Sequence, residues 1–250
     1  MVKDDYEKGF VDKILGDIFY TTTPRIRKEI TEKISIDKDT RILVVACRTG
    51  ETAFYLAKSF ECKVIGVDFF DGNIKEAEKI ARREKLTKRV SFIKGHATKM
   101  PFEDGSFDLI IFERSLSCYD DKETEIKECI RLLDKGGTFF MADFTVDAIE
   151  IADREDLKEL TCLVKALSMD EYLDLFSRNN LDITAEEKSD IAEKNSKILM
   201  QKWKKIRLFS NIFLKASSAD AGRFEKLMRK GETIIRENRL GYALFTGIKR

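Results

Sequence analysis

The chain has 250 residues, enough for one large α/β domain or one domain with a sizeable insertion. Its 46 Lys and Arg nearly cancel its 45 Asp and Glu, so the charge balance indicates neither a nucleic-acid nor a membrane-surface partner. No apolar run is long enough to span a bilayer, and the first ten residues are too charged for the core of a signal peptide. We therefore expect a cytoplasmic protein.

The cysteine and histidine content also limits the chemistry. None of the five cysteines lies in a CxxC pair, which favours buried, reduced thiols; they are Cys47, Cys62, Cys118, Cys129 and Cys162. A single histidine, His96, argues against a histidine-based metal site and against a Ser-His-Asp triad. We expect no metal.

Residues 1–35 alternate apolar and charged positions at helical spacing, and we expect two helices there that break around residues 20–24. Strands and helices then alternate. Short apolar runs predict buried strands at 41–47, 63–68, 90–93, 107–113 and 138–143. Helical spacing lies between them at 51–60, 72–83 and 122–133. This alternation predicts a parallel sheet with helices on both faces.

After residue 144 the strand signal fades. Residues 168–179 form a predicted helix with Ser168 as its N-cap, and 180–184 is a candidate sixth strand. Residues 188–240 have helical spacing throughout, and 242–248 is a candidate terminal strand. Because no repeat, low-complexity stretch or Pro/Gly linker interrupts the chain, we expect one unit.

The first strand is followed by small residues and a predicted helix N-terminus, a backbone arrangement that suits a carboxylate or other anionic group. The second strand ends at Asp68, about 20 residues past that turn, where an acid can bind both ribose hydroxyls. Phe69 and Phe70 follow, and either could stack on an adenine or lie in the core. Taken alone, these features fit NAD, S-adenosylmethionine (SAM) or a purely structural role equally.

The order of four motifs is more specific. They are ILVVACRTGE (42–51), VIGVDFFDGNIKEAEK (64–79), VSFIKGHATKMPFEDGSFDLIIF (90–112) and ECIRLLDKGGTFFMADF (128–144). In them the chain resembles the class I SAM-dependent methyltransferases, of the type found in ubiquinone and menaquinone biosynthesis. The resemblance implies an α/β fold with a Rossmann-like, seven-stranded, mostly parallel sheet, SAM as the cofactor, and methyl transfer to a small-molecule acceptor.

The resemblance also implies a set of cofactor-binding residues. The loop would line the methionine part of SAM, the acid would bind the ribose, an aromatic side chain would flank the adenine, and the end of the fourth strand would border the sulfonium. The residues are Ala46, Cys47, Arg48, Thr49, Gly50, Asp68, Phe69, Asn73, His96, Ala97, Arg114 and Ser115.

The chain departs from the family pattern at four of its positions. Ala46 and Arg48 replace loop glycines, and Val44 replaces an acid before the loop. His96 replaces the acid that accepts the adenine amino group, but a neutral imidazole can donate or accept one hydrogen bond. Arg48 could turn outward or pair with a carboxylate of SAM or of the acceptor.

We expect three regions: an N-terminal helical cap at 1–35, a SAM-binding core at 36–150, and a helical insertion at 185–240 over the acceptor site. The insertion resembles the caps of small-molecule methyltransferases of the sarcosine and tocopherol types. A cap excludes water and holds the acceptor near the methyl group. Candidate acceptor contacts are Met169, Trp203, Phe209 and Phe213.

Methyl transfer needs a general base only where the nucleophile must lose a proton. The candidates are Asp143, Glu113, Tyr119 and Tyr20, and none stands out. A thiol relay through Cys118 lacks the cysteine pattern of arsenic methyltransferases. Two alternatives remain: a SAM-binding protein with weak or lost catalysis, and an NAD(P)-dependent oxidoreductase, against which the segment MPFEDGSFDLI argues. We expect a monomer or a homodimer.

Overall fold

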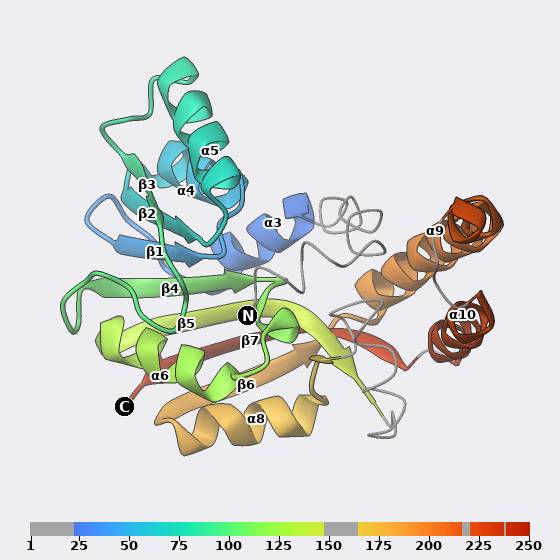
Figure 1. The fold of residues 1–250 in the computed structure, drawn as a ribbon. Coiled ribbons are helices and arrows are strands. Elements are labelled where there is room, and N and C mark those ends of the chain that lie inside the picture. The colour runs from blue at the N-terminus through green and yellow to red at the C-terminus, as the bar shows by residue number, and fades with distance from the viewer. Residues whose placement is uncertain (1–22, 148–164, 217–220, 238) are drawn as a thin grey trace.

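The computed structural model describes residues 23–147, 165–216, 221–237 and 239–250. Its strands are β1 Arg41–Val45, β2 Lys63–Asp68, β3 Val90–Lys94, β4 Phe107–Glu113, β5 Leu133–Val146, β6 Leu181–Glu187 and β7 Leu240–Lys249. They form one sheet in the order β3-β2-β1-β4-β5-β7-β6 (Figure 1). β7 is antiparallel to both of its neighbours, and the other strand pairs are parallel. The predicted seven-stranded, mostly parallel sheet is confirmed.

Helices cover both faces of the sheet because its strands are apolar on both sides. Ile42 and Val44 of β1 join one core cluster, and Leu43 and Val45 join the other. The first cluster includes residues of α3 Thr23–Lys33, α4 Glu51–Phe60 and α5 Asp71–Arg83. The second includes residues of α6 Lys122–Leu132 and α8 Met169–Arg178.

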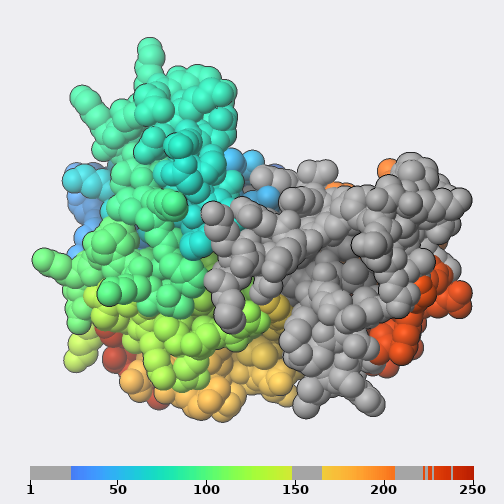
Figure 2. Space-filling view, in the orientation of Figure 1, coloured from blue at the N-terminus to red at the C-terminus, as the bar shows by residue number. Residues whose placement is uncertain are grey.

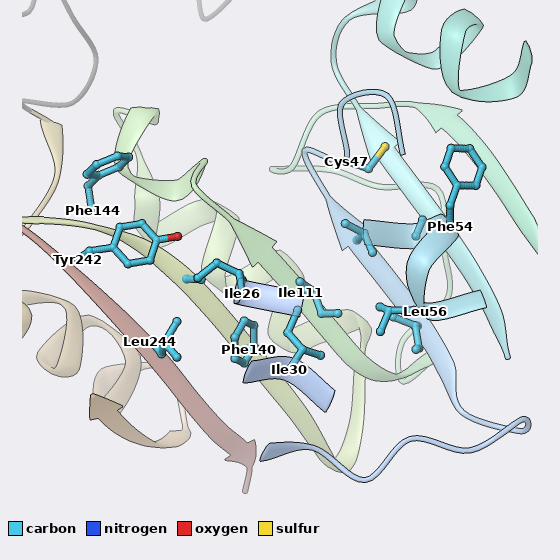
Figure 3. Packing of buried hydrophobic residues seen from close by; sticks show 14 of the residues in the cluster. Ile26, Ile30, Cys47, Phe54, Leu56, Ile111, Phe140, Phe144, Tyr242 and Leu244 are labelled. Atoms are coloured by element: carbon cyan, nitrogen blue, oxygen red, sulfur yellow. The ribbon is translucent and has the colours of Figure 1, made fainter. Parts of the chain in front are cut away.

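The first core joins the N-terminal side of the described chain to the middle of the sheet. Ile26 and Ile30 of α3 are fully buried and lie over Ile111 of β4 and Phe140 of β5 (Figure 3). Burying side chains of this size stabilises the fold by about 1.5–3 kcal/mol each. The helix expected before residue 20 lies outside the described residues.

Most predicted boundaries agree with the structure, and β5 is the main difference. The sequence predicts a strand at 138–143 after a Lys-Gly-Gly break, whereas β5 runs from Leu133 directly after α6 and continues to Val146. Its last three residues pair with β7, which is distant in sequence. Ser168 is the N-cap of α8, as predicted, and forms a capping box with Glu171.

The helical stretch expected at 188–240 consists of two helices, α9 Ser189–Ala216 and α10 Ala221–Arg236, which lie beside each other at one end of the sheet (Figure 1). The Trp203 indole N–H of α9 donates a hydrogen bond to the Met228 carbonyl of α10 at 2.8 Å. Trp203 is therefore a packing residue between these helices. In the space-filling view α5 and α10 stand at opposite ends of the described surface (Figure 2). Within the described residues, no helix is long and apolar enough to cross a membrane.

Candidate cofactor-binding site

The loop between β1 and α4 is a tight turn at the carboxyl end of the sheet, beside the point where the strand order reverses. The Cys47 N–H donates to the Val67 carbonyl at 3.0 Å, and the Gly50 N–H donates to the Cys47 carbonyl at 2.9 Å. Ala46 and Arg48 have left-handed φ values of 52° and 53°. This conformation costs a non-glycine residue roughly 1–2 kcal/mol. The loop therefore keeps the backbone conformation that glycine favours, although Ala46 and Arg48 occupy these two positions.

Gly50 itself is required by both conformation and space. Its φ is 85°, and a Cβ there would lie 2.5 Å from Cζ of Phe92. The Phe92 ring packs edge-on against Phe54, with centroids 5.4 Å apart. A Cβ at Gly66 of β2 would meet the same ring at 2.6 Å. The Phe92 ring thus packs between Gly50 of the loop and Gly66 of β2, and it sets the distance between the loop and the sheet.

Asp68, at the end of β2, lies against this loop. Its side chain is buried, and Oδ2 accepts a hydrogen bond from the Arg48 N–H at 2.8 Å. Oδ1 accepts from the Phe70 N–H at 2.9 Å and from the Asn73 amide at 3.0 Å. A carboxylate has about four lone-pair positions, so these three donors leave about one for a ligand hydroxyl. Asn73 acts here by orienting Asp68.

An aromatic edge continues from Asp68. The Phe69 and His96 rings are 5.5 Å apart, and the His96 and Tyr119 rings are 6.0 Å apart, both near perpendicular. Nδ1 of His96 accepts a hydrogen bond from the Thr98 N–H at 3.2 Å and lies 2.8 Å from the Thr98 hydroxyl, where either atom can be the donor. The bond from the N–H favours a neutral ring with its proton on Nε2. Burial lowers the pKa of His96 and favours this neutral form.

This geometry favours a hydrogen-bond donor on His96, where the sequence resemblance implies an acceptor. An Nε2–H can donate to a ring nitrogen of a purine but cannot accept from its amino group. Ala97, the next residue, is buried. The contacts of Thr98 with His96 were not anticipated from the sequence, because a backbone N–H, which every residue other than proline carries, gives no sequence signal.

Three of the four candidate general bases, Asp143, Tyr119 and Glu113, lie among the described residues. Asp143 of β5 is fully buried and accepts hydrogen bonds from the Ser115 N–H, the Ser117 N–H, the Ser117 hydroxyl and the Phe144 N–H. Those bonds make Asp143 an anchor for the turn after β4, although burial raises its pKa. Burial also raises the pKa of Tyr119, which disfavours its phenolate. Tyr20 lies outside the described residues.

The end of β4 carries a buried charged pair. Glu113 Oε1 accepts from Arg114 Nη2 at 2.5 Å, and Glu113 Oε2 accepts from the Thr52 hydroxyl of α4 at 2.6 Å. Arg114 has a left-handed φ of 52°. Next to it, the Ser115 hydroxyl is buried and has no hydrogen-bond partner among the described residues. A buried polar atom without a partner calls for an explanation, and a bound ligand atom is one.

The cysteines differ from the expectation in one respect. Cys47, Cys62 and Cys129 are buried free thiols, as predicted. Cys118, in the 3₁₀ turn Leu116–Cys118, is disulfide-bonded, so a fully reduced set is wrong. Of the candidate acceptor contacts, Met169 is half-buried against the second core, and the side chains of Phe209 and Phe213 lie outside the described part.

The sheet order, the turn at its switch point and the acid beside that turn together define a class I, Rossmann-like methyltransferase domain. Comparison with known proteins agrees. Residues 36–208 match the family model described as a methyltransferase domain, and the chain belongs to that family. The narrower resemblance to the ubiquinone and menaquinone enzymes stays a prediction.

Individual relatives extend the comparison. The chain is 26% identical to 27-O-demethylrifamycin SV methyltransferase of Amycolatopsis mediterranei, covering 91% of this chain and 84% of that one. It is 24% identical to sterol 24-C-methyltransferase of Debaryomyces hansenii, covering 89% and 63%. The chain spans only 33–63% of the length of several curated relatives that it matches.

A solved structure of phosphoethanolamine N-methyltransferase 2 from Haemonchus contortus, in complex with S-adenosylhomocysteine, has the same fold. Its TM-score is 0.72 at 16% identity, and the match covers all of this chain and 60% of that one. SAM is the cofactor of this class. The residues of the site fit SAM. Asp68 keeps one free acceptor position, and the loop has the left-handed φ values that glycine favours. The Ser115 hydroxyl has no hydrogen-bond partner in the described part of the chain.

Proposed function

We propose that this protein transfers the methyl group of SAM to a small-molecule acceptor. The contact between the Asp68 carboxylate and the Arg48 N–H carries the proposal, because it joins the ribose-binding acid to the methionine-binding turn. The small molecules in the names of the rifamycin and sterol relatives support an organic acceptor.

Bound SAM supplies a methyl group that its sulfonium already activates. The residues of this chain then have to hold the nucleoside, align the acceptor and exclude water. In the proposal Asp68 binds the ribose, and Phe69 and His96 flank the adenine. Residues 36–150 form the SAM-binding core, while 1–35 and the insertion at 185–240 cover the acceptor.

A second candidate is a protein that binds SAM but transfers methyl groups slowly or not at all. Two observations favour it: the strained, non-glycine positions Ala46 and Arg48, and the three protein donors that already occupy Asp68. The proposal of a SAM-dependent methyltransferase has four further parts. We propose that the protein is cytoplasmic, that it is a monomer or a homodimer, that it has no nucleic-acid partner, and that it is related to the ubiquinone and menaquinone enzymes.

Calorimetric titration tests the proposal directly. We expect heat from SAM and from S-adenosylhomocysteine, none from NAD, and methyl transfer from labelled SAM to one member of a metabolite panel. Asp68→Asn should weaken S-adenosylhomocysteine binding at least 10-fold, because it loses a charged hydrogen-bond acceptor. The matched control is Asp71→Asn on the exposed start of α5, which should bind as the unaltered protein does.

Other outcomes separate the candidates. SAM binding without turnover on any acceptor would favour the second candidate. Heat from NAD and none from SAM would refute both.

A further inference from the structure

A small cavity of about 30 Å³ lies between the loop after β1 and the end of β4. It is the right size for one ammonium group or one water molecule. Val44, Ala46 and Thr49 line it from the β1 side, Thr52 from α4, and Glu113 and Arg114 from β4. The loop is the part of the site expected to hold the amino-acid tail of SAM, so the charges around the cavity bear on how that tail is recognised.

Four charged residues line the cavity, Arg48 and Glu51 on the side of the loop and α4, and Glu113 and Arg114 on the side of β4. Glu51 is paired with Arg27 of α3 at 2.7 Å. Glu113 and Arg114 are paired with each other and are consecutive in the sequence. Side chains of neighbouring strand residues normally point to opposite faces of a sheet. The left-handed φ of Arg114 ends this alternation, and the Arg114 N–H donates to the Ala142 carbonyl of β5 at 2.8 Å. The side chains of Glu113 and Arg114 therefore both line the cavity. Only 9% of the Glu113 side chain and 7% of the Arg114 side chain are exposed.

A buried ion pair of this kind is seldom kept for stability alone, since apolar residues of similar volume often serve the fold as well. The pair lines a cavity that is also lined by Val44, where the sequence resemblance implies an acid. β1 and β4 are adjacent parallel strands, with Val44 paired to Ile111. The Glu113 carboxylate of β4 thus lies at the cavity that an acid at position 44 of β1 would also line.

We propose that Glu113 binds the α-ammonium group of SAM and that Arg114 binds its α-carboxylate, with Glu113 replacing the acid that is absent at Val44. The inference rests on SAM being the ligand of this protein. A zwitterion that binds beside this ion pair adds one charge of each sign, so the buried site stays neutral and the cost of desolvation is limited. Thr52 is a positioning residue, because its hydroxyl holds Glu113 at 2.6 Å.

Four ligands test each charge separately by calorimetry. They are S-adenosylhomocysteine, an analogue without the carboxylate (5′-(3-aminopropyl)thioadenosine), an analogue without the amine (5′-(3-carboxypropyl)thioadenosine), and 5′-methylthioadenosine, which lacks both. The unaltered protein should bind S-adenosylhomocysteine at least 10-fold more tightly than either single-group analogue, because each analogue loses a charge-assisted hydrogen bond.

The variants should respond selectively. Glu113→Gln should weaken S-adenosylhomocysteine at least 10-fold and change the amine-free analogue less than 3-fold. Arg114→Gln should show the reverse selectivity, affecting the amine-bearing, carboxylate-free analogue least. Glu76→Gln, an exposed acid on α5, is the control and should change none of the four affinities.

Variants that break a buried pair sometimes fail to fold, so two others keep the test decisive. The double variant Glu113→Gln with Arg114→Gln leaves no lone buried charge, and it should bind S-adenosylhomocysteine no more tightly than 5′-methylthioadenosine. Thr52→Val should weaken S-adenosylhomocysteine but not the amine-free analogue. If every variant weakens all four ligands equally, or none, the assignment of Glu113 and Arg114 is refuted. If the unaltered protein binds none of the four, the proposed function itself fails.

Discussion

The left-handed residues of the loop after β1 show how much of a binding motif can change in sequence while its backbone persists. Ala46 and Arg48 stand where glycines are usual, yet their φ values are those that glycine adopts most easily. Only Gly50 is held by space as well as by conformation. The sequence pattern could locate the loop, but it could not show which of its glycines the fold requires.

Gly50→Ala should therefore destabilise the protein by about 2 kcal/mol or more. An alanine at this position would have an unfavourable positive φ, and its Cβ would clash with the ring of Phe92 at 2.5 Å. Gly72→Ala in α5 is the matched control, since no atom lies within 4 Å of its added Cβ, and it should stabilise the helix by about 0.5–1 kcal/mol. Urea unfolding measures both. Equal midpoints for the two variants would show that the loop relaxes to accept a side chain.

At the scale of elements, β5 and the turn after β4 form one unit through Asp143. The carboxylate takes two backbone N–H groups and one hydroxyl from residues 115–117. Sequence reasoning marked Asp143 as a candidate base because it lies near a strand end. It could not reveal the anchoring role, because that depends on β4 and β5 being neighbours in the sheet.

Asp143→Ala should lower the free energy of unfolding by roughly 3 kcal/mol or more, because buried donors lose a charged acceptor. Chemical denaturation without any ligand measures this loss. Asp147→Asn, an exposed residue just past β5, should stay within about 0.5 kcal/mol. A stable Asp143→Ala protein that binds S-adenosylhomocysteine normally but has lost turnover would restore Asp143 as the base.

Sequence and structure agree best where an element is defined by its own residues. The apolar runs at 63–68 and 107–113 and the helix at 51–60 have the predicted bounds. The agreement is poorest where a distant strand decides the outcome: β5 extends to Val146 because Gly241 and Leu240 pair with its end. The acid at 68 was likewise predicted beside the loop, whereas the Glu113–Arg114 pair depends on a left-handed φ that the sequence does not signal.

For the molecule as a whole, buried charges in α6 make stability depend on pH. Burial raises the pKa of Glu125 to about 8, and its neighbours Lys122, Asp120 and Asp121 alter this value further. Between pH 4.5 and 8 the folded state thus holds a proton that the unfolded state releases, so stability falls as pH rises through this window. Burial lowers the pKa of Lys122 to about 8. Above pH 8 the folded state therefore releases a proton that the unfolded state keeps, and the contribution of Lys122 to stability rises with pH.

Glu125→Gln should remove the falling part of this profile. The variant should match the unaltered protein near pH 5 and exceed its free energy of unfolding at pH 8 by more than about 1.4 kcal/mol, the equivalent of one pKa unit. Urea unfolding at pH 5, 6.5 and 8 measures the difference. Glu78→Gln on the surface of α5 should give a profile parallel to that of the unaltered protein. A constant offset for Glu125→Gln at all three pH values would contradict the prediction.

The strand order has a consequence for the growing chain on the ribosome. β7 comes last of the described strands in sequence, yet it lies between β5 and β6. Until residues 240–249 have emerged, β6 has no strand among those described to join it to the sheet, and β5 presents an open edge. An open edge of apolar residues invites pairing with other chains. Translation must therefore run almost to residue 249 before the nascent protein can protect itself from aggregation.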